Sequence, residues 1–138
     1  MNTPGHINDQ PIKDFETPKN DYICITRDLT LNEYQLEAAK NKAFPEKYAI
    51  IYPTIGVLNE AGEMAGKIKK WMRGDTPNLN VEDLTGEIGD VLWYIASLCT
   101  DLGITMEDTA RNNIKKITLR REKNMIKGNG DHREIEIK

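Results

Sequence analysis

The sequence predicts an all-α protein built as a four-helix bundle. Apolar residues recur at intervals of three and four along most of the chain, as they do on one face of a helix. Residues with the spacing of helix caps precede these stretches, and a glycine follows two of them. Outside a short apolar patch at residues 22–25, no stretch has a convincing strand pattern. The length of 138 residues suits one domain.

We divide the chain into three parts on the basis of composition. Residues 1–28 are expected to form an irregular N-terminal arm, since the first 21 are polar, carry three of the six prolines and show no periodicity. This start also lacks the apolar segment of a secretory signal. Residues 29–127 are expected to form the helical domain, and residues 128–138 a glycine-broken C-terminal tail.

The first two predicted helices have clear boundary signals. Thr30 followed by Glu33 has the spacing of a capping box, which predicts a helix over about Leu31–Ala43. The second helix is predicted over Pro53–Arg73, ending at Gly74. Its apolar residues fall in one arc at 100° per residue: Val57, Leu58, Ala61, Met64, Ala65, Ile68 and Met72.

The third and fourth helices are predicted in the same way. Asn80 with Asp83 opens a helix that reaches about Leu102 and is stopped by Gly103. Its apolar stripe consists of Leu84, Ile88, Val91, Leu92, Ile95, Leu98, Cys99 and Leu102. Thr105 with Asp108 opens the last helix, to roughly Lys123.

Composition excludes several classes of protein. A net charge of −3 argues against a general nucleic-acid-binding surface, which needs an excess of Lys and Arg on one face. No apolar run is long enough to span a membrane. Cys24 and Cys99 are two scattered thiols that suit neither a disulfide framework nor a zinc-finger spacing. We therefore expect a cytoplasmic protein that binds neither nucleic acid nor membrane.

Two acid pairs carry the predicted chemistry. Glu60 and Glu63 stand at i, i+3 on the second helix, and Glu87 and Asp90 do so on the third. Each pair lies on one helix face about one turn apart. If the two helices pack antiparallel with axes about 8–10 Å apart, the four carboxylates can converge at their shared edge. Four acids at close quarters resist ionisation unless a cation lies between them.

The ligand type indicates a hard cation. Carboxylate oxygens favour Mg²⁺, with Mn²⁺ as the alternative. Zinc sites use His or Cys, whereas His6 and His132 lie in the two tails, and no Glu-x-x-His pair of a di-iron bundle is present. Gly62 and Gly89 lie inside the acid motifs although each costs about 1 kcal/mol in a helix, which indicates close approach of a partner helix or a ligand.

An ordinary surface can also explain these acids. Glu63 and Lys67 stand at i, i+4, and such pairs are common on solvated helix faces, where they form salt bridges. In that interpretation the protein is a non-catalytic helical dimerisation module. The recurrence of the acid pair on a second helix favours the metal site.

At these residues the sequence resembles the MazG-like nucleotide pyrophosphohydrolases of the all-α NTP pyrophosphatase superfamily, in their compact bacterial and phage form. The runs LNEAGEMAGKIKKW and LTGEIGDVLWYIASLCTDLGI carry the likeness, which extends over residues 29–133. The family pattern of Glu-x-x-Glu followed by Glu-x-x-Asp is matched by Glu60, Glu63, Glu87 and Asp90. Its later Asn-x-x-Lys-x-x-x-Arg element is matched by Asn113, Lys116 and Arg120.

The resemblance implies a Mg²⁺-dependent hydrolase that cleaves a (d)NTP into a (d)NMP and pyrophosphate, to sanitise or balance the nucleotide pool. The alternative enzyme is a phosphoribosyl-ATP pyrophosphohydrolase from a related branch. In either enzyme the four carboxylates bind the metal, and Glu63 or Glu60 also orients or deprotonates the attacking water. We expect further substrate contacts from the following residues: Lys67, Trp71, Tyr94, Asn113, Lys116, Arg120, Asp131 and Arg133.

The predicted helices also leave apolar surface that a single short chain cannot cover. Small residues surround Trp93 on the back of the third helix, which suggests a second packing surface. Together with the family resemblance, this predicts a homodimer or a dimer of dimers.

Overall fold

The computed structural model describes residues 28–123 and residue 125. Our predictions for the N-terminal arm, for the tail and for Asp131 and Arg133 lie outside these residues. In the described part, the all-α prediction is confirmed, since it contains helices and no strand. The elements are α1 (Leu31–Ala39), the 3-10 helix η1 (Glu46–Tyr48), α2 (Ile51–Arg73), α3 (Val81–Asp101) and α4 (Met106–Glu122).

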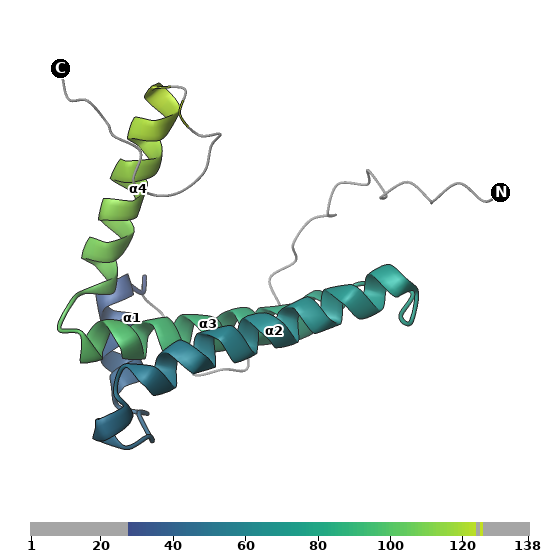
Figure 1. The fold of residues 1–138 in the computed structure, drawn as a ribbon, viewed down its shortest axis with the longest axis horizontal. Helices are drawn as coiled ribbons and strands as arrows, with labels where there is room; N and C mark the ends of the chain where they lie inside the picture. Colours follow the sequence, from purple (N-terminus) through teal and green to yellow (C-terminus); the bar gives the residue numbers. More distant parts are fainter. Residues whose placement is uncertain (1–27, 124, 126–138) are drawn as a thin grey trace.

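A long helical hairpin is the main body of the fold. Helices α2 and α3 run antiparallel over their full lengths, while α1 crosses one end of the hairpin and α4 rises from that same end (Figure 1). Most tertiary contacts join α2 to α3, and α1 packs mainly on α3. The two acid-bearing helices are therefore direct neighbours, as the sequence required.

The predicted caps are present and explain where the helices begin and end. Thr30 and Glu33 form a complete capping box, and Asn80 accepts hydrogen bonds from the first turn of α3. The Thr105 side chain accepts from the backbone N–H of Asp108. Helix α2 ends at Gly74, whose φ of 86° lies in the left-handed region that glycine adopts without strain.

Two boundary predictions differ from the structure: α2 begins at Ile51, two residues before the predicted Pro53, and the end of α1 was misplaced. Helix α1 ends at Ala39 rather than at Ala43, so the predicted helix is four residues too long. The Asn41 side chain donates to the Glu37 carbonyl at 3.2 Å and satisfies an acceptor at the helix end. Farther on, Pro45 disfavours helical geometry at the residue before it, so the chain turns into η1 instead of continuing.

The core of the described residues is small. Its buried hydrophobic members are Ala38, Ala96, Cys99 and Met106, with Tyr34, Leu92, Trp93 and Ile95 packed around them. Helix α3 covers only part of the apolar face of α2. Leu58, which belongs to that face, therefore remains 69% exposed. A core of this size provides little stability for a single chain.

Side chains of α1 hold the start of α4. The Gln35 amide donates to the carbonyl of Ile104 at 2.9 Å and to the Thr100 hydroxyl at 3.2 Å, while its oxygen accepts from the Met106 N–H at 2.7 Å. This one side chain therefore fixes the turn between α3 and α4. No described helix is long and apolar enough to cross a membrane.

An ion pair joins the segment after α1 to the end of α3. Lys42 contacts Asp101, whose side chain is only 4% exposed, and also reaches the exposed Glu46. The Lys42 ammonium lies 5.0 Å from the centre of the Phe44 ring. This cluster fixes the loop that leads into α2.

Candidate functional site

The structure brings three of the four predicted metal ligands together. Carboxylate oxygens of Glu60, Glu63 and Glu87 all lie within 4.8 Å of one another. Glu60 and Glu63 come from consecutive turns of α2, and Glu87 reaches them from α3. Glu87 is buried, Glu60 is half-buried and Glu63 is exposed, so the cluster opens from the hairpin interface towards solvent.

Asp90 borders this cluster without belonging to the close group. Its side chain is exposed, one turn beyond Glu87 on α3. Its negative charge contributes to raised pKa values at Glu60, at Tyr94 and at Tyr34 of α1. Asp90 thus lies close enough for its charge to act on the cluster from the side where α1 crosses.

The surroundings of Glu60 disfavour its ionised form. Burial is the largest cause of a raised pKa at Glu60, and the neighbouring charges of Glu63 and Asp90 raise this pKa further. A hydrogen bond from Asn59 acts in the opposite direction. These effects, together with a hydrogen bond between Glu60 and Glu87, disfavour the ionised carboxylate of Glu60, and a bound cation would offset them.

A lysine and an amide already serve the cluster as donors. The Lys67 ammonium pairs with Glu87 and donates to the Asp83 carbonyl at 3.0 Å. The salt bridge of Lys67 therefore crosses to α3, whereas the surface interpretation placed it on Glu63. The Asn59 amide donates to Glu63 at 2.9 Å and to Glu60 at 3.3 Å. The three clustered side chains offer only carboxylate oxygens, and Glu87 already attracts the Lys67 ammonium. Oxygen ligands of this kind fit a hard divalent ion.

Aromatic side chains continue from the cluster towards η1. Tyr94 lies one turn after Asp90, and the charge of Glu60 contributes to its raised pKa, after burial and the neighbouring Tyr52. Tyr52 stacks on Phe44 with ring centres 4.7 Å apart. Trp93 meets both the Tyr94 and the Phe44 rings edge-on, so it packs within its own chain.

Sequence reasoning missed several residues beside the carboxylates. Asn59, Tyr52 and Gly56 lie on α2 and Tyr34 lies on the crossing helix α1, and none of them carries a motif. A Cβ built on Gly56 would lie 2.4 Å from the Tyr94 ring, so this glycine is the one at which α3 approaches α2 closely. At Gly62 and Gly89 nothing in the described part of the chain lies within 4 Å of such a Cβ. The predicted close approach of a neighbouring helix within the chain is therefore wrong at those two positions.

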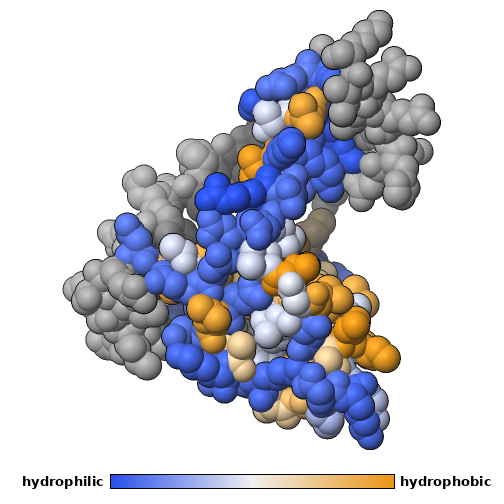
Figure 2. Space-filling view, turned by 90° about the vertical axis from the view of Figure 1, so that its left-hand side faces the viewer, coloured by the Kyte–Doolittle hydropathy of each residue, from blue (hydrophilic) through white to orange (hydrophobic). Residues whose placement is uncertain are grey.

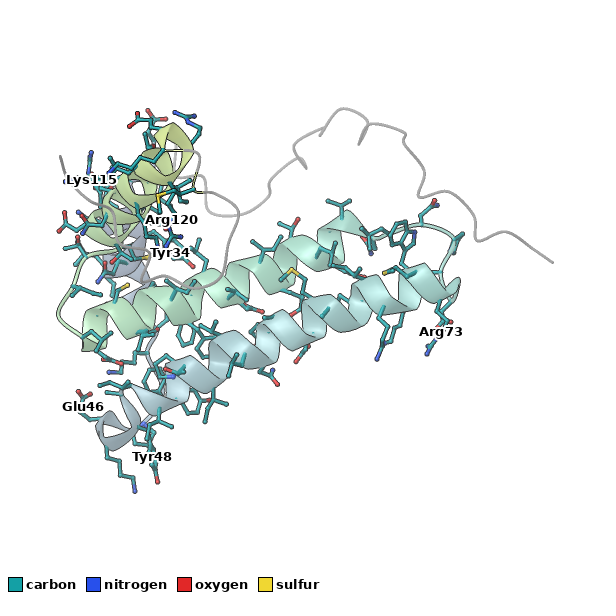
Figure 3. All side chains as sticks on the ribbon, turned by 45° about the horizontal axis from the view of Figure 1, so that its top comes forward. Tyr34, Glu46, Tyr48, Arg73, Lys115 and Arg120 are labelled. Atoms are coloured by element: carbon teal, nitrogen blue, oxygen red, sulfur yellow. The ribbon has the colours of Figure 1, made fainter. Side chains whose placement is uncertain are left out.

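The remaining predicted substrate contacts lie away from the carboxylates in this chain. Trp71 is half-buried near the end of α2, about two turns beyond Glu63. Asn113 and Lys116 are exposed on α4, and together with Thr109 and Asn112 of the same helix they line one shallow pocket. Arg120 lies near the far end of α4, the helix that rises from the end of the hairpin opposite Arg73 (Figure 1 and Figure 3). Among the described residues, α4 packs on α1 and on α3 and rises away from the hairpin, so these side chains lie apart from the acid cluster of the same chain (Figure 1).

Comparison with known proteins agrees with this geometry. Residues 54–125 match the profile described as the MazG nucleotide pyrophosphohydrolase domain, and this range contains all four carboxylates. The chain is also similar to the Gene 37 protein of Mycobacterium phage L5. The two are 34% identical over 109 residues, which cover 72% of this chain and 96% of the phage protein. No solved structure gave a significant match.

Proposed function

Because this chain belongs to the MazG nucleotide pyrophosphohydrolase family, we propose that it hydrolyses nucleoside triphosphates to monophosphates and pyrophosphate in a Mg²⁺-dependent reaction. The observation that carries the proposal is the meeting of Glu60, Glu63 and Glu87 at the α2–α3 interface. In this proposal the enzyme acts in the cytoplasm, and its substrates are canonical or damaged (d)NTPs.

The metal would be held by Glu60, Glu63, Glu87 and Asp90, with Mn²⁺ as a possible substitute for Mg²⁺. The raised pKa of Glu60 and the cation pairing of Glu87 support this assignment. When bound, Mg²⁺ neutralises charge on the phosphates and lowers the pKa of water. Without that neutralisation the carboxylates would repel a polyphosphate.

The protein's own groups would orient and deprotonate the water. Glu63 is the exposed member of the cluster, and Asn59 fixes one of its carboxylate oxygens. In our proposal Glu63 accepts the proton from the attacking water. The water oxygen then bonds to a phosphorus of the α–β linkage as the bridging P–O bond breaks. Lys67 exchanges its contact with Glu87 for a phosphate oxygen.

A substrate panel tests this proposal directly. The purified chain is incubated with canonical and modified (d)NTPs and with phosphoribosyl-ATP, with Mg²⁺, with Mn²⁺ or with EDTA, and pyrophosphate release is measured. We expect release from at least one (d)NTP that depends on the metal. Release from phosphoribosyl-ATP alone would favour the alternative enzyme, and no release under any condition would favour the non-catalytic dimerisation module.

Replacing Asp90 by Asn is expected to lower turnover by about a hundredfold, because a metal ligand with a full charge is lost. Helix content should be unchanged, since Asp90 is exposed. Steady-state kinetics and far-UV circular dichroism of the variant provide the test. Unaltered turnover would remove Asp90 from the proposed metal site.

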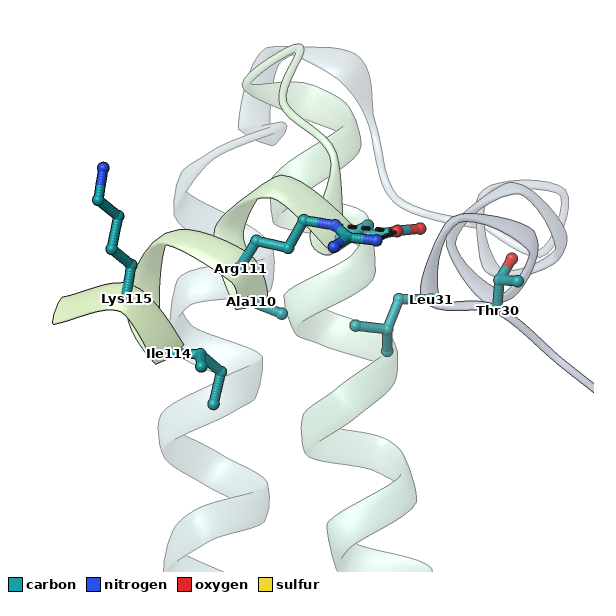
Figure 4. A pocket seen from close by; sticks show the side chains of 7 residues that line it. Thr30, Leu31, Ala110, Arg111, Ile114 and Lys115 are labelled. Carbon is teal, nitrogen blue, oxygen red and sulfur yellow. Dashed lines mark hydrogen bonds and ion pairs between the residues drawn. The ribbon is translucent and has the colours of Figure 1, made fainter. Parts of the chain in front are cut away.

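We further propose that the working protein is a homodimer. Ile51, Ile55 and Leu58 form an exposed stripe on α2 at helical spacing, each at least 60% exposed. Ile114 of α4 is also exposed, and it lines a groove of about 670 Å³ with Leu31 at the start of α1 (Figure 4). Figure 2, which views this end of the molecule, shows hydrophobic side chains interrupting the hydrophilic surface. A second copy is the simplest cover for such a surface.

A dimer would also explain the position of the α4 residues. Lys116 and Arg120 match the family pattern but lie on a helix that rises away from the hairpin (Figure 1). In a symmetric pair, α4 of one copy can reach the carboxylates of the other. Each site would then combine the acid cluster of one chain with the cations of its partner.

Subunit complementation tests the shared site. Glu60→Gln and Arg120→Ala chains should each be nearly inactive, because each removes one half of every site. After co-refolding, the mixture should regain roughly a quarter of wild-type activity, since half of the assorted dimers contain one intact site. No recovery in mixed dimers, or a monomer in sedimentation at micromolar concentration, would contradict the shared site.

A further inference from the structure

Gly56 is the glycine of α2 that the tertiary structure depends on most directly. It is buried within α2, where glycine costs about 1 kcal/mol relative to alanine. A Cβ at this position would lie 2.4 Å from Cδ1 and Cε1 of Tyr94 and 2.5 Å from Cζ. These distances are far below van der Waals contact, so the phenol ring occupies the space of the missing side chain.

Two further aromatic contacts restrain this ring. Trp93 meets Tyr94 edge-on with ring centres 4.9 Å apart, and the ring of Tyr52 lies 6.3 Å away. The ring edge that carries Cζ rests on α2, and the phenol hydroxyl shares a hydrogen bond with Tyr52, while the charges of Glu60 and Asp90 also act on it. Glu60 follows Gly56 by one turn of α2, and Asp90 precedes Tyr94 by one turn of α3.

We propose that Gly56 is a positioning residue of the nucleotide site: it lets the Tyr94 ring rest on α2 and holds the phenol hydroxyl beside Glu60 and Asp90. There the hydroxyl exchanges its contact with Tyr52 for a hydrogen bond that it donates to a phosphate oxygen of the substrate. This inference builds on the proposed function. It gives the substrate contact expected of Tyr94 to the hydroxyl rather than to the ring face, because the ring already packs against α2.

The test compares Gly56→Ala with Tyr94→Phe and with their double variant. Gly56→Ala is expected to lower kcat/KM by about tenfold or more, since small displacements of a positioned group are costly in catalysis. Tyr94→Phe should show a similar loss, mainly in kcat. The double variant should lose no more than the larger single loss, because both changes remove the same hydrogen bond.

Matched controls separate positioning from general destabilisation. Gly66→Ala changes another glycine of α2 that has open space in the described structure, and it should keep wild-type kinetics with an unchanged or higher Tm. Gly56→Ala combined with Tyr94→Leu removes the clash, so its Tm should recover while its activity stays low. Near-UV circular dichroism of the metal-free proteins should change in Gly56→Ala, which moves Tyr94 against Trp93, and not in Gly66→Ala.

Two outcomes would overturn the inference. One is wild-type kcat/KM in Gly56→Ala or in Tyr94→Phe. The other is an unchanged near-UV spectrum in Gly56→Ala, which would show that the ring is not displaced. A wild-type protein that hydrolyses no nucleotide would instead refute the proposed function and the role of the hydroxyl, while the spectra would still decide whether Gly56 positions Tyr94.

Discussion

Replacing Glu60 by Gln is expected to raise the Tm of the metal-free protein while lowering hydrolysis by roughly a thousandfold. The loss of activity follows from removing a charged ligand, which contributes several kcal/mol of transition-state stabilisation. The gain in stability follows from the raised pKa of Glu60, since burial and the charges of Glu63 and Asp90 disfavour its ionised form. The charged carboxylate of Glu60 thus supports catalysis but lowers the stability of the metal-free fold.

The effect of Glu60→Gln on Tm should depend on pH, which can be measured for the metal-free protein in EDTA. A carboxyl group with a raised folded-state pKa destabilises the folded state as the pH rises from the ordinary value of 4.5 through the folded pKa. The Tm advantage of Glu60→Gln should therefore grow as the pH rises through the folded-state pKa and should vanish below about pH 4.5. Saturating Mg²⁺ should reverse the order, because only the wild type gains fully from binding.

The exposed Glu122 near the end of α4 provides a control for this experiment. Glu122→Gln makes the same chemical change away from the cluster, and it should leave both hydrolysis and the effect of Mg²⁺ on Tm as they are in the wild type. A Glu60→Gln protein with a lower Tm than the wild type in EDTA would refute the repulsion argument. Retained hydrolysis would remove Glu60 from the metal site.

The second large effect is expected for Lys42→Met, which should lower Tm by at least about 10 °C. The substitution keeps an unbranched side chain beside Phe44 but leaves Asp101 without its cation. The Asp101 side chain is only 4% exposed and lies in the last turn of α3, where the helix dipole also disfavours a negative charge. A buried charge that loses its partner is strongly destabilising.

Differential scanning calorimetry of three variants measures this effect. Lys40→Met removes an exposed lysine whose ion pair within the described residues is with the exposed Glu37, and it should change Tm by no more than a few degrees. The double variant Lys42→Met with Asp101→Leu should recover much of the loss, because no unpaired charge remains. A Tm for Lys42→Met equal to that of Lys40→Met would show that the pair contributes little.

Local signals explain why most of the fold was predictable. Helix starts depend on side chains within three residues of the cap, so Thr30, Asn80 and Thr105 marked three of them correctly. The end of α1 was missed because the segment after Ala39 keeps helix-forming residues, and the turn depends on what Lys42 and Phe44 contact. The hydrophobic periodicity of the sequence gives no information about contacts between residues so far apart in the chain.

By itself the sequence determined the all-α class, the acid pairs and the face of each helix that carries them, because all of these follow from spacing along a regular helix. Tertiary structure alone decided which acids meet, that Lys67 crosses to Glu87, and that Gly56 rather than Gly62 accommodates a neighbouring side chain. These outcomes depend on the relative rotation and axial offset of two helices, which are set by packing between residues far apart in the chain.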